Sequence, residues 1–184
     1  HLVSLQRLSG KLRDINLLDG VMHIGGLVTH RDVEISDLVK EYAPIVSEVY
    51  GRVATVRIRN MATVGGGLAH SDPAQDPSGA LIVTGASVTL VSEEGKRTVG
   101  VEDLSTDYYE TSIASNEILT EVAIPVMNAG LRHAYYKYLP RTADDYATVA
   151  VCAVAAVKGD TCSDIKLALG ALGPTPIRAK VVED

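Results

Sequence analysis

The feature that most constrains this chain is an unbroken run of three glycines, Gly65 to Gly67, between Thr63 and a short apolar segment. Glycine adopts positive φ angles without steric cost and lets another group approach the backbone closely. Successive amides of such a run can point into one concavity and bind an anion such as a phosphate. Asp76, whose carboxylate can bind sugar hydroxyls, follows one short segment later. The run predicts a phosphate-binding loop, and a plain glycine-rich surface turn is the alternative.

The spacing around these glycines differs from two common nucleotide-binding loops. A Walker loop ends in Lys-Ser or Lys-Thr, and no such pair follows Gly67. The G-x-G-x-x-G turn of dinucleotide-binding domains does not match either. The glycines alone therefore do not identify a nucleotide.

Length, composition and charge restrict the class of protein. A chain of 184 residues can bury one good core or two small ones. Its hydrophobic fraction of 46% and charged fraction of 22% are typical of a globular protein. A net charge of −6, without a long basic run, argues against nucleic acid or an anionic membrane as the main partner. No apolar segment approaches the length of a membrane span, and no signal peptide is visible. A cytoplasmic location is expected.

The cysteines and histidines indicate no metal site. Cys152 lies in an apolar run, which predicts a buried, inert thiol. Cys152 and Cys162 form no C-x-x-C pair, so an iron–sulfur or zinc site in this chain is not expected. The histidines are scattered, and no two of them form a pair at helical spacing with a carboxylate nearby. His70, which follows the glycines, is predicted to contact a ligand rather than a metal.

The pattern of apolar residues predicts an α+β fold with a domain boundary at 128–130. All eight aromatic residues are tyrosines, so aliphatic side chains must fill the core. Alanine richness within 150–156 leaves a helix open there as an alternative to a strand. The predicted strands cover 1–8, 21–27, 86–92, 97–99, 117–124, 131–138, 147–158 and 161–170. The predicted helices begin after the N-cap Thr29 and at Pro44, cover 77–84, and start again within 177–183.

Three segments together resemble a known family. The first reads Arg59-Asn60-x-Ala62-Thr63-x-Gly65-Gly66, followed by Asp72-Pro73 and Asp76, and the others are residues 117–125 and 136–147. They are similar, in order and spacing, to the FAD-binding (medium) subunit of molybdenum hydroxylases. This family includes xanthine, aldehyde and carbon monoxide dehydrogenases, and the resemblance covers nearly the whole chain.

The resemblance implies a division of the chain into two parts. Residues 1–128 resemble the second subdomain of the vanillyl-alcohol-oxidase (PCMH)-type FAD-binding fold. Residues 129–184 resemble the start of the family's α+β C-terminal flavoprotein domain. The family's first glycine-rich loop has no counterpart in 1–27, and the chain does not begin with Met. We therefore expect a chain truncated at both ends, which alone binds FAD weakly or not at all.

The resemblance also implies a set of flavin-binding residues. Lys137 is placed near the flavin, where the pattern alone predicts a solvated strand lysine. Asp145 and Tyr146 are placed over the isoalloxazine ring, and the backbone of Leu119 against it. The full set is Ala62, Thr63, Gly65, Gly66, Gly67, His70, Asp76, Leu119, Lys137, Asp145 and Tyr146, with no catalytic and no metal-binding residue. The family usually has Asn where this chain has Gly67, which offers a cofactor only its amide.

The implied function is electron transfer. FAD would receive electrons from 2Fe-2S clusters on a small subunit, after a molybdopterin cofactor on a large subunit has oxidised the substrate. The acceptor would be NAD, oxygen or a quinone. Two alternatives are a stand-alone flavin-dependent oxidoreductase of the same fold superfamily and a non-catalytic assembly module that has lost FAD.

Overall fold

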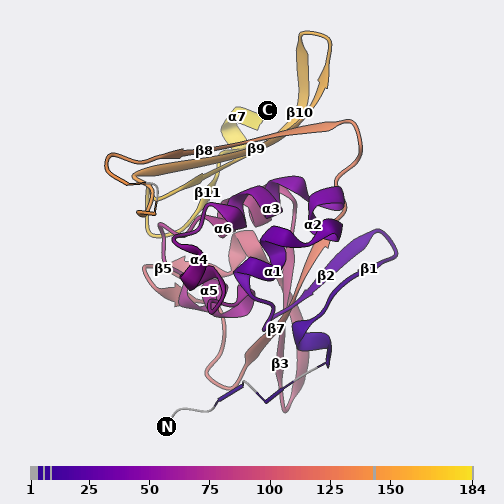
Figure 1. Cartoon of the computed structure of the whole chain (residues 1–184), viewed down its shortest axis with the longest axis vertical. Coiled ribbons are helices and arrows are strands. Elements are labelled where there is room, and N and C mark those ends of the chain that lie inside the picture. The colour runs from indigo at the N-terminus through magenta and orange to yellow at the C-terminus, as the bar shows by residue number, and fades with distance from the viewer. Residues whose placement is uncertain (1–3, 6, 9, 143, 184) are drawn as a thin grey trace.

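The computed structural model describes residues 4–5, 7–8, 10–142 and 144–183. Within the strand predicted for 1–8, residues 1–3 and 6 lie outside the described residues, and the others are not in a strand. Helices form a layer between two antiparallel sheets (Figure 1). A third, two-stranded sheet of β5 (Ser105–Asp107) and β6 (Glu110–Thr111) is separate from both.

The first sheet has five strands in the order β1-β2-β7-β3-β4. They are β1 (Ile15–Leu18), β2 (Val21–Gly25), β7 (Ile118–Pro125), β3 (Ser87–Ser92) and β4 (Gly95–Gly100), and a 3₁₀ turn, η1 (Gly10–Arg13), precedes them. Asp19 and Gly20 both have positive φ in the β1–β2 hairpin, as a type I′ turn requires. The predicted strand near 21–27, the hairpin β3–β4 and the strand near 117–124 are confirmed.

Six helices form the middle layer (Figure 1). They are α1 (His30–Ile35), α2 (Asp37–Tyr42), α3 (Pro44–Gly51), α4 (Val56–Arg59), α5 (Val64–His70) and α6 (Pro77–Val83). Thr29 caps α1 in a capping box with Asp32, and Pro44 occupies the first turn of α3, as predicted. Helix α2 was not predicted; it lies between the N-cap Ser36 and Ala43, which ends it.

The three glycines lie in helix α5, so the predicted loop is wrong. None of Gly65, Gly66 and Gly67 has a positive φ. Thr63 is the N-cap, and its hydroxyl accepts a hydrogen bond from the Gly66 amide. A Cβ on Gly65 would lie 2.8 Å from the backbone oxygen of Gly26, at the end of β2. Glycine is needed here because α5 packs directly on the backbone, not because of a turn.

The second sheet has four strands in the order β11-β10-β9-β8 and lies on the other side of the helices. Its strands are β8 (Leu131–Tyr138), β9 (Val149–Lys158), β10 (Thr161–Gly170) and β11 (Ile177–Arg178). The hairpin prediction is confirmed, and the helical alternative within 150–156 is wrong. Burial in β9 alternates with the period of a strand. The predicted C-terminal helix is shorter than expected: α7 spans Lys180–Glu183 and β11 precedes it.

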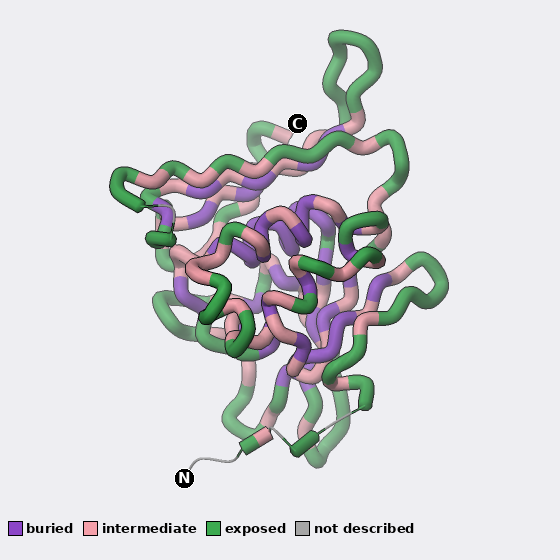
Figure 2. Tube along the Cα trace, in the orientation of Figure 1, coloured by how far each residue is buried: buried purple, intermediate pink, exposed green. Residues whose placement is uncertain are grey.

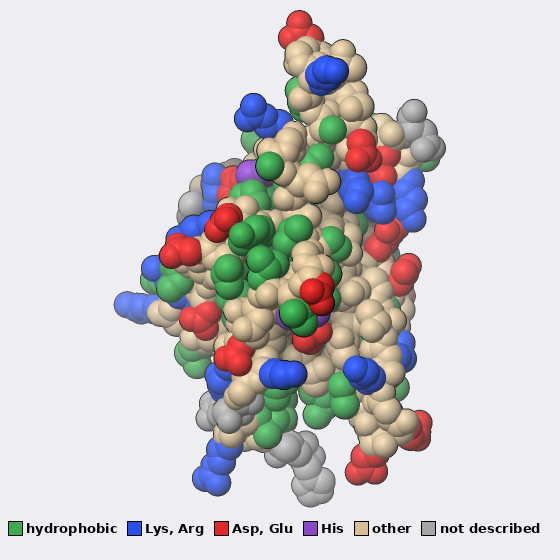
Figure 3. All heavy atoms as spheres, turned by 90° about the vertical axis from the view of Figure 1, so that its right-hand side faces the viewer, with side chains coloured by type: hydrophobic (Ala, Val, Ile, Leu, Met, Phe, Trp, Pro, Cys, Tyr) green, Lys and Arg blue, Asp and Glu red, His purple; other side chains and the backbone are tan. Residues whose placement is uncertain are grey.

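One hydrophobic core joins the layers. It takes residues from the first sheet, the helices and the second sheet, including Cys152, which is buried as predicted. The core is aliphatic apart from Met22, Cys152 and Tyr50, the one tyrosine that is fully buried among the described residues. In Figure 2 buried segments gather in the helices and the strand centres, and the hairpin tips are exposed. On the face in Figure 3, acidic and basic side chains are interspersed around apolar ones.

Candidate functional site

A cavity of about 380 Å³ opens at the N-terminal end of α6. This volume lies in the range of small-molecule sites. Its walls come from α4, α5, the segment before α6, strand β8 and the 144–146 loop. The lining residues are His30, Val53, Ala54, Ile58, Ala62, Gly67, His70, Asp72, Gln75, Asp76, Pro77, Lys137, Asp144, Asp145 and Tyr146.

A buried ion pair forms one wall of this cavity. Lys137 Nζ lies 2.7 Å from Asp76 Oδ2, and the Tyr135 hydroxyl donates to Asp76 Oδ1 at 2.7 Å. The Lys137 side chain is only 3% exposed, so the prediction of a solvated strand lysine is wrong. Burial raises the pKa of Asp76, while hydrogen bonds from Lys137 and Tyr135 counteract that rise. The pair also joins α6 to the second sheet.

His30 and Gly67 meet at the inner end of the cavity. His30 is 6% exposed, and its Nε2 lies 3.2 Å from the carbonyl oxygen of Thr63. Its ring packs edge-on against Tyr50 at a centroid distance of 4.9 Å. Burial lowers the pKa of His30; the Thr63 carbonyl opposes this shift and the charge of Arg59 adds to it. The ring is therefore held as a fixed, neutral wall at neutral pH.

Arg59 fixes the turn that closes a second wall. Its side chain is 12% exposed. The guanidinium donates to the backbone oxygens of Val53 and Ala54 at 2.8 and 3.0 Å and pairs with Glu34 at 2.8 Å. Ala54 has a φ of +39°, a conformation unfavourable for a residue with a Cβ. The two carbonyl contacts stabilise that turn, so this arginine of the sequence motif shapes the cavity without lining it.

The outer edge of the cavity carries Tyr146, which is 66% exposed, above the buried carboxylate of Asp72. Partial burial and the nearby Asp72 raise the pKa of Tyr146. His70 packs against the ring of Tyr109 at a centroid distance of 5.3 Å. The loop is stabilised by two hydrogen bonds between Thr142 and Asp145. Exposed side chains such as Tyr146 therefore surround the mouth, while buried and hydrogen-bonded side chains form the interior.

The structure brings together seven of the predicted flavin-binding residues. Ala62, Gly67, His70, Asp76, Lys137, Asp145 and Tyr146 line the cavity. Thr63, Gly65, Gly66 and Leu119 do not. Leu119 lies behind Gly26, since a Cβ on Gly26 would be 2.5 Å from its backbone oxygen. The contacts of all eleven with a flavin stay predictions.

The amides of the three glycines are already used within the chain. The Gly65 amide donates to the oxygen of Gly26, and the Gly67 amide to the oxygen of Thr63, both at 2.9 Å. The Gly66 amide donates to the Thr63 hydroxyl at 3.1 Å. The run therefore contributes space, through its missing side chains, rather than free donors.

Several residues that line the larger cavity have no role in the predictions from the sequence. They are His30, Val53, Ala54, Ile58, Gln75 and Pro77. Gln75 stands directly before Asp76 in the motif, so its position was a usable signal. His30 follows the N-cap Thr29, which sets its place on the first turn of α1. No local sequence pattern predicts the turn at Ala54, because the conformation of this turn depends on the contact with Arg59.

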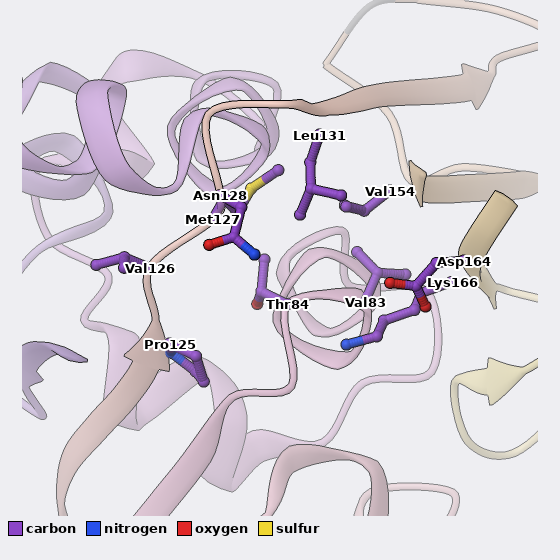
Figure 4. Close-up of a pocket in the computed structure, with 10 residues that line it drawn as sticks. All are labelled: Val83, Thr84, Pro125, Val126, Met127, Asn128, Leu131, Val154, Asp164 and Lys166. Atoms are coloured by element: carbon purple, nitrogen blue, oxygen red, sulfur yellow. The ribbon is translucent and has the colours of Figure 1, made fainter. Parts of the chain in front are cut away.

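A second, smaller cavity of about 170 Å³ lies at the C-terminal end of α6 (Figure 4). Its lining residues are Val83, Thr84, Pro125, Val126, Met127, Asn128, Leu131, Val154, Asp164 and Lys166. In Figure 4 the ends of the Lys166 and Asn128 side chains are directed into it. Six of its ten lining residues are apolar, and Thr84, Asn128, Asp164 and Lys166 are polar or charged.

Two negative findings apply to the described part of the chain. No group of three or more His, Cys, Asp or Glu residues there is arranged to hold a metal ion. In the same residues, every helix is too short or too polar to cross a membrane.

Family models match both parts of the chain. Residues 1–127 match the FAD binding domain in molybdopterin dehydrogenase, and residues 134–184 match the CO dehydrogenase flavoprotein C-terminal domain. The carbon monoxide dehydrogenase medium chain of Afipia carboxidovorans is 34% identical over 92% of this chain and 60% of its own length. The glyceraldehyde dehydrogenase medium chain of Sulfolobus acidocaldarius is 33% identical over 90% of this chain and 58% of its own length.

A solved structure shares the fold. Carbon monoxide dehydrogenase from Hydrogenophaga pseudoflava aligns with a TM-score of 0.90 at 32% identity, over 94% of this chain and 60% of the other. This agrees with the expected α+β architecture of a PCMH-type flavin domain. The chain spans about three fifths of the length of the relatives it matches.

Proposed function

Because the chain belongs to the family of FAD-binding domains in molybdopterin dehydrogenases, we propose that it holds FAD for electron transfer in a molybdenum hydroxylase. The observation that carries the proposal is the convergence of two distant segments. Residues 62–76 and 137–146 carry most of the predicted flavin contacts, and both segments line the same cavity. FAD is larger than a drug-sized ligand, so a cavity of about 380 Å³ takes one part of it.

The residues of this chain bind and orient the cofactor. Each oxygen of Asp76 accepts one hydrogen bond and keeps a second lone pair, which can accept from a cofactor hydroxyl. Lys137, held by Asp76, keeps its ammonium group at the cavity wall, where it could donate a hydrogen bond to a bound cofactor. FAD itself supplies the redox chemistry when it is bound, and the protein supplies position and electrostatics.

The wider assignment belongs to the same proposal. Residues 1–128 form the flavin domain and 129–184 part of the C-terminal domain. The partners are a molybdopterin-containing large subunit and a small subunit with 2Fe-2S clusters, and the acceptor is NAD, oxygen or a quinone. A cytoplasmic location stays a prediction from the sequence.

The test uses the full-length polypeptide that carries these residues. We expect the purified protein to show the visible absorption bands of a flavin and to co-purify with molybdenum and iron–sulfur subunits. Asp76→Ala should lower FAD affinity about ten- to hundredfold, because it removes a charged acceptor. Flavin without partner subunits would support the stand-alone oxidoreductase, and partners without flavin the assembly module. Either result contradicts the proposal.

A further inference from the structure

The larger cavity has an apolar wall at α4 and the turn that precedes it. Val53, Ala54 and Ile58 lie on this wall, and their side chains form no hydrogen bonds. Among the described lining residues, aspartates outnumber the single lysine, Lys137. The aspartates are Asp72, Asp76, Asp144 and Asp145. This excess of negative charge disfavours a phosphate, whereas an apolar wall suits the face of a planar ring.

Two cations hold the backbone of this turn. Arg59 Nη1 donates to the carbonyl oxygens of Val53 and Ala54 at 2.8 and 3.0 Å. Lys137 Nζ donates to the carbonyl oxygen of Arg52 at 3.3 Å, so three successive carbonyl groups accept hydrogen bonds from side chains. Arg59 does not line the cavity. It therefore binds the turn from behind the wall and leaves the cavity side of Val53 and Ala54 open to a ligand.

The conformation of Ala54 depends on this support. Its φ is +39°, and a residue with a Cβ is strained there unless the surrounding structure fixes it. Arg59 is itself fixed, because its Nε donates to Glu34 Oε2 at 2.8 Å, while Arg31 donates to the other oxygen of Glu34 at 2.7 Å. A lysine could not replace Arg59, because an ammonium group lacks the planar fork that reaches the carboxylate and both carbonyl oxygens at once.

We propose that Arg59 is a positioning residue for FAD, which holds Val53 and Ala54 in the conformation that packs against a planar aromatic ring of the cofactor. The inference rests on the proposed function, since FAD is the ligand. FAD has two such rings, the isoalloxazine and the adenine, and either can lie flat on an apolar wall. The pyrophosphate then lies outside this cavity, away from the aspartates.

A rescue experiment in the full-length polypeptide tests the role of Arg59. FAD is removed, and its rebinding is measured by quenching of flavin fluorescence. Arg59→Lys keeps the charge but loses the bonds to the turn, so it should weaken FAD binding about tenfold. Adding Ala54→Gly should restore the affinity to within about threefold, because glycine adopts a positive φ without support. An arginine that acted only by pairing with Glu34 would not be rescued in this way, so an absent rescue overturns the proposal.

Visible circular dichroism at saturating FAD identifies the ring. A changed flavin spectrum in Arg59→Lys assigns the apolar wall to the isoalloxazine ring. An unchanged spectrum together with weaker binding assigns the wall to the adenine ring. If Arg59→Lys binds FAD as tightly as the parent, the role of Arg59 is overturned.

The matched control is Arg97→Lys. Arg97 also donates to a carboxylate, that of Glu117, and to a backbone oxygen, that of Ser112, but none of the three lines the cavity, so FAD affinity should not change. If Arg59→Lys does not fold, Glu34→Gln replaces it, because it removes the charge that orients Arg59 and should weaken FAD binding about threefold. Unchanged affinity in that variant would overturn the role of Arg59. A parent that binds no FAD overturns the proposed function itself.

Discussion

The two cavities at the ends of helix α6 differ in how far their charged side chains are buried and paired. At the N-terminal end, Asp76 and Lys137 are buried and paired at 2.7 Å. At the C-terminal end, Lys166 and Asp164 belong to none of the ion pairs among the described residues, and Asp164 is exposed. A charge that leaves water must be paired, whereas a charge that stays in water need not be. Only the first cavity therefore has a pre-organised polar wall.

The pairing also connects the two parts of the chain. Asp76 precedes α6 in the region matched by the flavin domain, and Tyr135 and Lys137 belong to β8 in the region matched by the C-terminal domain. The integrity of the larger cavity therefore depends on how the second sheet docks on the helices. Among the described residues, those that line the smaller cavity form no comparable ion pair, so changing its charges should have little effect.

The largest contrast is expected between the two lysines. Lys137→Met leaves the Asp76 carboxylate buried without its cation, which should lower the free energy of unfolding by about 3–5 kcal/mol. Lys166 forms no salt bridge with the described residues and acts on Glu183 only through its charge, so Lys166→Met should lower the free energy of unfolding by less than about 0.5 kcal/mol. Urea denaturation of both variants measures the difference. Equal losses would show that the ion pair does not distinguish the cavities.

The hydroxyl of Tyr135 should have a smaller effect. Tyr135→Phe removes the donor to a buried carboxylate and should cost about 1.5–3 kcal/mol. The matched variant at the smaller cavity is Thr84→Val. It removes the hydrogen bonds from the Thr84 hydroxyl to the backbone oxygens of Ala80 and Leu81 in α6, which should lower the free energy of unfolding by about 1 kcal/mol. Chemical denaturation compares them, and a larger loss in the threonine variant would contradict this account.

Tyr146 at the mouth should affect kinetics more than stability. It is mostly exposed, so Tyr146→Ala should change the free energy of unfolding by less than about 0.5 kcal/mol. If its ring lies at the reactive edge of the flavin, the variant should alter reoxidation by the acceptor while flavin content stays the same. Stopped-flow reoxidation measures this, with Tyr136→Ala, an equally exposed tyrosine on β8, as the control. Unchanged reoxidation would mean that the ring is elsewhere.

The smallest effect concerns pH. Burial lowers the pKa of His30 below 6.5, so between that value and the folded-state pKa the unfolded chain binds more protons than the folded one. Stability should therefore decrease as pH falls below 6.5 and level off below the folded-state pKa. His30→Asn should flatten this slope in thermal unfolding. An unchanged slope in His30→Asn would assign the dependence to other groups.

The sequence by itself determined the local elements whose signals lie within a few residues. Thr29 with Asp32 specified the start of α1, and Pro44 the start of α3. Alternating apolar residues specified the hairpin of β9 and β10. The family motif also identified residues that share one cavity, because their order and spacing could be compared directly. These signals are short-range, so the chain carries them without its tertiary context.

Only the tertiary structure decided how the glycines and the charges are used. Three glycines are unfavourable in a helix by about 1 kcal/mol each, so local propensity favoured a loop. Helix α5 forms nevertheless, because its backbone packs against Gly26. Asp76 and Lys137 are 61 residues apart in the chain, and nothing local distinguishes this lysine from a solvated one. The docking of the second sheet buries both groups, and burial makes their pairing necessary.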